Sequence, residues 1–173
     1  MKRYPIIVYA RACIYFTLYG LVKYFPTPLG DVLRYAVLKI FMKRINTTYI
    51  RDGATFLFPE NISIGKNACI NEWVWMDGSG GIEIGSNVLF SPGVCIISFN
   101  HGFKAKDKCI AEQDKELGAI VIEDDVWLGA GSKVLKGVRI GKGSIVGAGS
   151  VVTEDIPAYS ICVGSPAKVI SKR

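Results

Sequence analysis

The only histidine of the 173-residue chain is His101. A neutral imidazole accepts a proton near physiological pH, so this residue could act as a general base. A site that needs two or three imidazoles is excluded within one chain. The cysteines do not suit a thiolate zinc cluster or a disulfide framework, because no two have Cys-x-x-Cys spacing and their number is odd. The five cysteines are Cys13, Cys69, Cys95, Cys109 and Cys162.

The sequence changes character directly after His101. Residues 102–118 hold eight charged side chains among seventeen residues, with only scattered apolar ones. A segment of this composition cannot form the buried face of a strand, so we expect it to leave the body of the protein as an excursion loop. Long loops in a compact domain commonly carry function. The tripeptide Asn100-His101-Gly102 lies where this loop begins.

The residues on both sides of the loop repeat with a period of six. An apolar residue recurs at every sixth position, often followed by glycine, and the phase shifts by two residues at residues 78–81. This pattern is typical of a hexapeptide β-solenoid, in which each hexad forms a short strand and a turn and three hexads form one coil. About fourteen hexads predict an all-β solenoid of about five coils. The repeat positions are Phe58, Ile64, Ile70, Met76, Ile84, Phe90, Ile96, Ile122, Leu128, Val134, Ile140, Val146 and Val152.

The positive charge of the chain lies in its N-terminal third. Residues 1–51 carry nine basic residues and one acid, whereas the remaining 122 residues carry 12 basic and 14 acidic residues. We therefore predict a basic, apolar helical segment over 1–51 and a solenoid domain over 52–173. Because the solenoid part is slightly acidic, we expect no nucleic-acid partner.

Two helices are expected in the N-terminal segment. From Ile6 to Val22 the only charged residue is Arg11, and after a break at Pro26-Thr27-Pro28 a second helix could run from Gly30 to about Arg44. Three placements fit this composition. The helices could lie on an anionic membrane surface, or cap the solenoid or an oligomer. A membrane span is the third, although seventeen residues with an internal arginine are short for one.

Three motifs resemble the hexapeptide acyltransferases. They are Val126-Trp127-Leu128-Gly129-Ala130-Gly131, the run from Ile140 to Thr153, and Val163-Gly164-Ser165-Pro166-Ala167-Lys168. With Asn100-His101 before an expelled loop, they resemble the sugar and polysaccharide O-acetyltransferases and the galactoside, maltose and xenobiotic acetyltransferases over about residues 60–170. The resemblance implies a left-handed parallel β-helix, a homotrimer, acetyl-CoA bound in a groove between subunits, and no required metal.

The resemblance also implies roles for single residues. His101 matches the family's catalytic histidine, a base that removes the acceptor's proton as its oxygen attacks the thioester in a direct transfer. The predicted cofactor-binding residues line the acetyl-CoA groove or approach its phosphates; they are Gly129, Ala130, Ala148, Thr153 and Lys168. This chain has Glu154 where relatives often carry lysine, and an acid near a phosphate would weaken binding.

The acceptor side carries fewer signals. Asn71 lies where galactoside-type relatives place an acceptor-binding asparagine, and Asn100 precedes the catalytic histidine, so both are predicted to bind substrate. The imidazole of His101 could be oriented by Glu112, by Glu116 or by a backbone carbonyl.

The expected function is that of an acetyl-CoA-dependent O-acetyltransferase. Its acceptor is expected to be a hydroxyl of a sugar, a surface polysaccharide or a lipid-linked glycan precursor. We expect a cytoplasmic protein that is peripheral at the inner face of the plasma membrane if residues 1–51 bind lipid. An N-acetyltransferase for an amino sugar and a catalytically inactive β-helix scaffold are the alternatives. The γ-class carbonic anhydrases share the coils but use three histidines, which this chain does not have.

Overall fold

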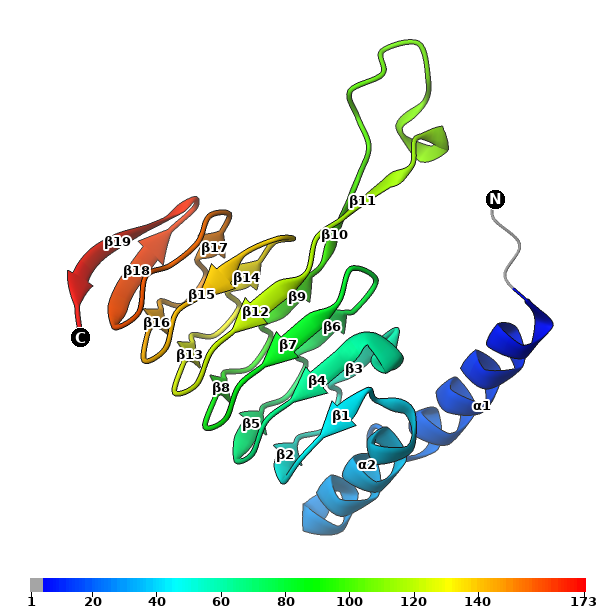
Figure 1. Ribbon diagram of the computed structural model, residues 1–173. Helices are drawn as coiled ribbons and strands as arrows, with labels where there is room; N and C mark the ends of the chain where they lie inside the picture. Colours follow the sequence, from blue (N-terminus) through cyan, green and yellow to red (C-terminus); the bar gives the residue numbers. More distant parts are fainter. Residues whose placement is uncertain (1–4) are drawn as a thin grey trace.

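The computed structural model describes residues 5–173 and consists of two helices followed by a parallel β-solenoid (Figure 1). The helices are α1 (Ile6–Val22) and α2 (Thr27–Phe41). They lie at the end of the solenoid where the chain enters it, and one long hairpin projects from the middle of the solenoid (Figure 1). No helix in the described part of the chain is long and apolar enough to cross a membrane.

Three parallel sheets form the faces of the solenoid. Sheet A contains β1 (Arg44–Ile45), β4 (Ile62–Ile64), β7 (Ile82–Ile84), β12 (Ile120–Ile122) and β15 (Arg139–Ile140). Sheet B contains β2 (Thr48–Ile50), β5 (Ala68–Ile70), β8 (Leu89–Phe90), β13 (Trp127–Leu128), β16 (Ile145–Val146), β18 (Ser160–Gly164) and the antiparallel strand β19 (Ala167–Lys172). Sheet C contains β3 (Thr55–Leu57), β6 (Trp75–Asp77), β9 (Cys95–Ile97), β14 (Lys133–Val134) and β17 (Val151–Val152).

The solenoid has about six coils, one more than the repeat predicted. The additional coil consists of β1, β2 and β3, so residues 44–50 form strands although they lie inside the segment predicted to be helical. The inward residues of this coil are Ile45, Ile50 and Phe56, which pair with Ile64, Ile70 and Met76 of the next coil. Their uneven spacing hides the coil from a search for a period of six.

The apolar repeat positions stack on one another inside the solenoid, as expected for this fold. Phe58 is the exception, since its side chain is 40% exposed and its backbone has a positive φ. The short 3-10 helix η1 (Pro59–Asn61) follows it directly, and Phe56 fills the core in its place. The buried stacks are Ile64, Ile84, Ile122 and Ile140 in sheet A, Ile70, Phe90, Leu128 and Val146 in sheet B, and Met76, Ile96, Val134 and Val152 in sheet C.

The helices cap the first coil with hydrogen bonds as well as apolar contacts. The hydroxyl of Tyr15 donates to the carbonyl of Phe56 at 2.9 Å, and that of Tyr19 donates to the carbonyl of Ala54 at 3.0 Å. Buried Arg34 donates from Nε to the carbonyl of Ile50 at 2.8 Å. An open sheet edge leaves such carbonyls unpaired and prone to pairing with another chain, so these side chains close the edge.

Candidate active site

His101 lies on a hairpin that leaves the corner between sheets C and A. The chain passes from β9 through Ser98 into β10 (Phe99–His101), which pairs antiparallel with β11 (Lys115–Leu117). Residues 102–114 form the projecting part, which includes the 3-10 helix η2 (Ile110–Glu112) (Figure 1). The excursion expected after His101 is therefore present.

Buried Ser98 anchors the base of this hairpin. Its Oγ donates to the carbonyl of Asp77 at 2.6 Å and accepts from the amide of Gly80 at 2.8 Å. The carbonyl of Ser98 accepts from the amide of Gly118 at 3.0 Å, where the chain returns to the solenoid. The position of the hairpin is thus tied to the coil beneath it.

The imidazole of His101 is exposed at the root of the hairpin. Its ring meets the ring of Phe99 edge-on, with centroids 5.6 Å apart, and its backbone lies opposite Lys115. Within residues 5–173 no carboxylate binds the imidazole. Glu116, one of the predicted partners, is instead held by Lys136 at 3.3 Å and lies 3.7 Å from the Nζ of Lys104. One chain therefore leaves the imidazole available to other groups.

Gly129, Ala130 and Ala148 lie together at the corner between sheets B and C. The amide of Gly129 donates to the carbonyl of Val146 and that of Gly149 to the carbonyl of Ala130, both at 2.8 Å. A Cβ on Gly129 would lie 2.6 Å from the amide nitrogen of Ala148, so only glycine fits between these coils. The sequence left open whether these residues shape the corner or bind a ligand, and the structure shows that they shape the corner.

The same corner also has features of a binding site. Ala130 and Ala148 are exposed, and neither amide donates a hydrogen bond within the described chain. Small side chains let an extended ligand approach the backbone, and free N–H groups can bind its carbonyl oxygens. This corner therefore has the small side chains and free amides that an extended ligand with carbonyl oxygens requires.

Thr153 lies apart from that corner, whereas Lys168 pairs with Val163 at the next turn of the same column of corners. Thr153 is exposed at the end of β17, on the edge of sheet C that adjoins sheet A. The Nζ of Lys168, on β19, lies 3.3 Å from a carboxylate oxygen of Glu154. The cation predicted to meet the phosphates is thus paired with the acid that departs from the family pattern.

Asn71 belongs to the same column of corner residues as Gly129. Backbone hydrogen bonds from Asn71 to Phe90 (3.1 Å) and from Ser91 to Leu128 (2.9 Å) place it two coils before Gly129. With strands about 4.8 Å apart, the separation along the axis is about 10 Å. Asn100, in contrast, lies in β10 opposite Glu116, so the two predicted substrate-binding residues sit at opposite edges of sheet C.

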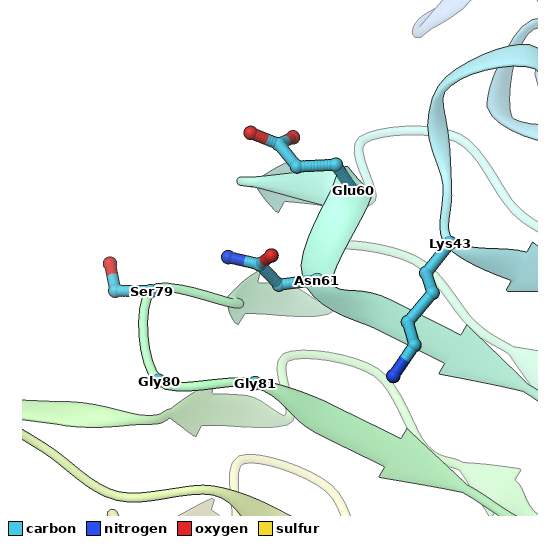
Figure 2. Close-up of a pocket in the computed structure, with 6 residues that line it drawn as sticks. All are labelled: Lys43, Glu60, Asn61, Ser79, Gly80 and Gly81. Atoms are coloured by element: carbon cyan, nitrogen blue, oxygen red, sulfur yellow. The ribbon is translucent and has the colours of Figure 1, made fainter. Parts of the chain in front are cut away.

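A polar pocket of about 470 Å³ opens one coil before the hairpin (Figure 2). It is lined by Lys43, Glu60, Asn61, Ser79, Gly80 and Gly81. The turn that contains Ser79, Gly80 and Gly81 contacts the base of the hairpin, because the carbonyl of Gly81 accepts a hydrogen bond from the amide of Ile120 at 3.0 Å. The sequence analysis did not identify this pocket, although the two-residue phase shift at residues 78–81 marks the enlarged turn that forms one wall.

The thiols of the solenoid are not poised as nucleophiles. Burial is the largest cause of a raised pKa for Cys69, Cys95 and Cys162, so these thiols stay protonated near neutral pH. A covalent acyl-thiol step at these residues is therefore disfavoured.

One carboxylate at the corner between sheets A and B has a lowered pKa. Glu123 accepts a hydrogen bond from the amide of Lys142 at 2.9 Å, the main cause of the lowered pKa, and a second from Arg139 at 2.8 Å. Glu123 thus joins two successive turns between sheets A and B.

Comparison with known proteins agrees with this architecture. Residues 119–154 match the family described as bacterial transferase hexapeptide (six repeats). A galactoside O-acetyltransferase of Lactococcus lactis is 39% identical over 114 residues, which are 65% of this chain and 54% of that protein. The chain spans about half the length of the curated relatives it matches.

Solved structures show the same fold over nearly the whole chain. A hexapeptide-repeat acetyltransferase of Vibrio cholerae, complexed with acetyl-CoA, has a TM-score of 0.81 and 28% identity, covering 94% of this chain and 89% of that chain. A maltose O-acetyltransferase of Clostridium difficile has a TM-score of 0.81 and 27% identity, covering 92% and 84%. The fold and these similarities show that the chain resembles the hexapeptide-repeat acetyltransferases.

Proposed function

We propose that this protein transfers the acetyl group of acetyl-CoA to a hydroxyl of a sugar or glycan. The observation that carries the proposal is the position of its only histidine, exposed at the root of a hairpin that leaves a hexapeptide solenoid. The Vibrio cholerae relative was solved with acetyl-CoA, and the Lactococcus lactis relative is a galactoside O-acetyltransferase.

The proposed mechanism uses one side chain and one backbone amide. Acetyl-CoA supplies an acyl group activated as a thioester. The imidazole of His101 takes the proton of the attacking hydroxyl, and the free amide of Ala130 donates to the carbonyl oxygen as it gains negative charge. The protonated imidazole then returns its proton to the leaving thiolate. No acyl-enzyme is needed, which agrees with the protonated state of the solenoid thiols.

A complete site of this kind requires a second copy of the chain. His101 leaves the edge of sheet C that adjoins sheet A, whereas Ala130 lies at the edge that adjoins sheet B. The strand and turn between these edges span about five residues, or roughly 16 Å, too far for both groups to contact one acetyl group. We propose a homotrimer in which the hairpin of one protomer faces the Ala130 corner of its partner.

The acceptor is proposed to bind near the root of the hairpin. The pocket beneath it offers the Lys43 ammonium, the Glu60 carboxylate, the Asn61 amide and the Ser79 hydroxyl (Figure 2). Such a set of donors and acceptors suits a molecule with several hydroxyl groups, as a sugar has. Asn100, and Asn71 of a neighbouring protomer, are proposed to contribute further hydrogen bonds.

The test compares the wild-type protein with His101→Ala. We expect both proteins to bind acetyl-CoA with dissociation constants within about twofold by calorimetry, because the proposed contacts to acetyl-CoA come from the Ala130 corner and the imidazole contacts the acceptor hydroxyl. Transfer to a panel of galactosides, glucosides and amino sugars should fall by about 100-fold or more in the variant. Full activity of the variant would refute the role of His101. If the wild-type protein does not bind acetyl-CoA, the scaffold alternative holds.

The shared site is tested by mixing two inactive variants. Ala148→Tyr fills the exposed corner, and His101→Ala removes the base, so each homotrimer should be inactive. Refolding the two together should restore part of the activity, because some interfaces then combine an intact histidine with an intact corner. Absence of recovery would show that each chain holds a complete site.

N-acetylation is the second candidate. A tetrahydropyridine-dicarboxylate N-acetyltransferase of Staphylococcus aureus is 55% identical over 53 residues, which are 31% of this chain. The amino sugars in the panel separate the candidates, because modification of the amine in preference to every hydroxyl would favour the N-acetyltransferase.

A further inference from the structure

The helix α1 presents an apolar surface that is exposed among the described residues 5–173. Only Tyr15 and Tyr19 of this helix are buried, and both face the first coil. The outer face of α1 is formed by Ile6, Ile7, Tyr9, Ala10, Cys13, Ile14, Phe16, Thr17, Gly20 and Leu21, which are all exposed. Ile6 is 87% exposed and Leu21 is 74% exposed. A continuous apolar surface of this kind marks an interaction site.

Further apolar side chains are exposed beyond α1. The connection to α2 exposes Tyr24 and Phe25, and α2 itself exposes Leu29, Val32 and Ile40. The outer face of α1 contains no charged residue. A partner that covers this surface must therefore be largely apolar at its centre.

The charges around this surface are almost all positive. The only acid among residues 5–51 is Asp31, whose carboxylate binds Arg34 at 2.6 Å and Arg51 at 2.8 Å. Exposed cations that form no ion pair within the described residues remain on and beside the helices; they are Arg11, Lys39 and Arg44, while Lys43 lies 3.8 Å from Glu83. Apolar residues bordered by lysine and arginine match the boundary between the acyl chains and the headgroups of an anionic lipid layer.

The charge distribution disfavours a second copy of the chain as the occupant. Two such surfaces in contact would bring an excess of cations together, because Asp31 is already engaged and Glu60, which lies near Tyr15, is outnumbered by the exposed cations. The hydrogen bonds of Tyr15 and Tyr19 to the first coil also hold α1 along the solenoid end. The helix can lie in a membrane surface without losing these bonds, whereas it could not cross a membrane and keep them.

We propose that α1 lies in the headgroup region of an anionic bilayer, with its outer face toward the acyl chains and the cations beside it on lipid phosphates. This arrangement suits the anionic cytoplasmic leaflet of the plasma membrane. The pocket that contains Lys43 is formed by the coils next to the helices, so a lipid-linked acceptor could reach it from the bilayer. The inference stands independently of the proposed acetyl transfer.

The first experiment measures co-sedimentation of the full chain with vesicles of phosphatidylcholine containing about a third phosphatidylglycerol. We expect the double variant Ile7→Glu/Leu21→Glu to bind at least about tenfold more weakly than the wild type. The matched control is Ile170→Glu, since Ile170 is 63% exposed on β19 at the opposite end of the solenoid, and it should bind like the wild type. Vesicles of phosphatidylcholine alone should bind the wild type at least about tenfold more weakly, because each cation near an anionic surface contributes to attraction.

A second experiment places the helix in the bilayer directly. Cys13 lies on the outer face of α1 and Cys109 lies on the hairpin, and both are exposed. A polarity-sensitive dye on Cys13 should shift to the blue when vesicles are added, whereas the same dye on Cys109 should not.

Three results would overturn the proposal. They are equal vesicle binding by the double variant and the wild type, no spectral shift at Cys13, or wild-type protein that stays in the supernatant. Lipid-free self-association that the double variant abolishes would assign the surface to a second copy instead. Acetyl-CoA titration of the same double variant separates this question from catalysis, because the Ala130 corner lies several coils from α1 and its affinity should not change.

Discussion

Replacing Ser98 with alanine removes one oxygen atom from the base of the hairpin that carries His101. The side chain is fully buried, and its Oγ makes two hydrogen bonds, to the carbonyl of Asp77 at 2.6 Å and from the amide of Gly80 at 2.8 Å. Each such bond contributes about 0.5–1.5 kcal/mol to stability. We therefore expect Ser98→Ala to lower the free energy of unfolding by about 2 kcal/mol.

Two further serines provide matched comparisons. The buried Oγ of Ser144 also makes two bonds, donating to the carbonyl of Pro157 at 2.8 Å and accepting from the amide of Ser160 at 3.2 Å, so Ser144→Ala should cost a similar amount. The buried Oγ of Ser132 has no hydrogen-bond partner within residues 5–173. Removing an unpaired buried hydroxyl should leave stability unchanged or raise it by about 1 kcal/mol.

The assay is equilibrium unfolding in urea, followed by circular dichroism, with the slope of the transition compared between variants. If Ser132→Ala destabilises the protein as much as Ser98→Ala does, the cost arises from the space left by the oxygen and the reasoning from hydrogen bonds is refuted. Activity distinguishes the two destabilised variants. Ser98→Ala should also lower the transfer rate, because it loosens the hairpin, whereas Ser144→Ala should not.

Three other perturbations test separate parts of the structure. Glu154→Ala should strengthen acetyl-CoA binding a few-fold in low salt by releasing Lys168, and calorimetry should show the gain disappearing at about 1 M salt. Gly129→Ala should reduce both stability and acetyl-CoA affinity, because its Cβ would lie 2.6 Å from a backbone nitrogen; Gly20→Ala, with nothing within 4 Å of the new Cβ, should instead raise stability by about 0.5–1 kcal/mol. Because the pKa of Glu123 is lowered, its ionised form stabilises the fold above the ordinary carboxyl pKa, and this stability is lost as the pH falls. Between about pH 5 and pH 3, the urea midpoint of the wild-type protein should therefore drop more than that of Glu123→Gln. Equal pH dependence of the two proteins would contradict this assignment.

The solenoid could be predicted because its information is local and repeated. Each hexad specifies one strand and one corner, and a corner such as Gly129 repeats the chemistry of the others. The first coil escaped prediction for the same reason, since Ile45 precedes Ile50 by five residues and Phe56 is out of phase with the repeat that begins at Ile64. Phe58 was assigned to the core, but the turn at η1 places it on the surface and Phe56 inside.

The candidate site was only partly visible in the sequence. His101 could be predicted as a candidate base because it is the only imidazole and stands before a charged loop, and the structure places it at the root of that loop. The sequence showed that Glu154 stands where relatives often carry lysine, but it did not show which cation this acid contacts. Its 3.3 Å contact with Lys168 depends on the antiparallel return of β19. The polar pocket combines Lys43, which follows α2, with residues of η1 and of the turn before β7. No local sequence pattern links these three segments.

The sequence by itself determined the type of structure and the one residue that could supply an imidazole. A period of six with glycine at the corners favours one fold, and a lone histidine beside a polar loop limits an imidazole base to one position. The tertiary structure decided how these parts are arranged. His101 and Ala130 lie at opposite edges of sheet C because of the coil lengths and the strand register. These are set by packing between residues about twenty positions apart. The orientation of α1 was likewise decided by the tertiary structure. The composition of α1 indicated an apolar helix. Only the contacts of Tyr15 and Tyr19 showed which face of that helix the solenoid covers and which face stays exposed.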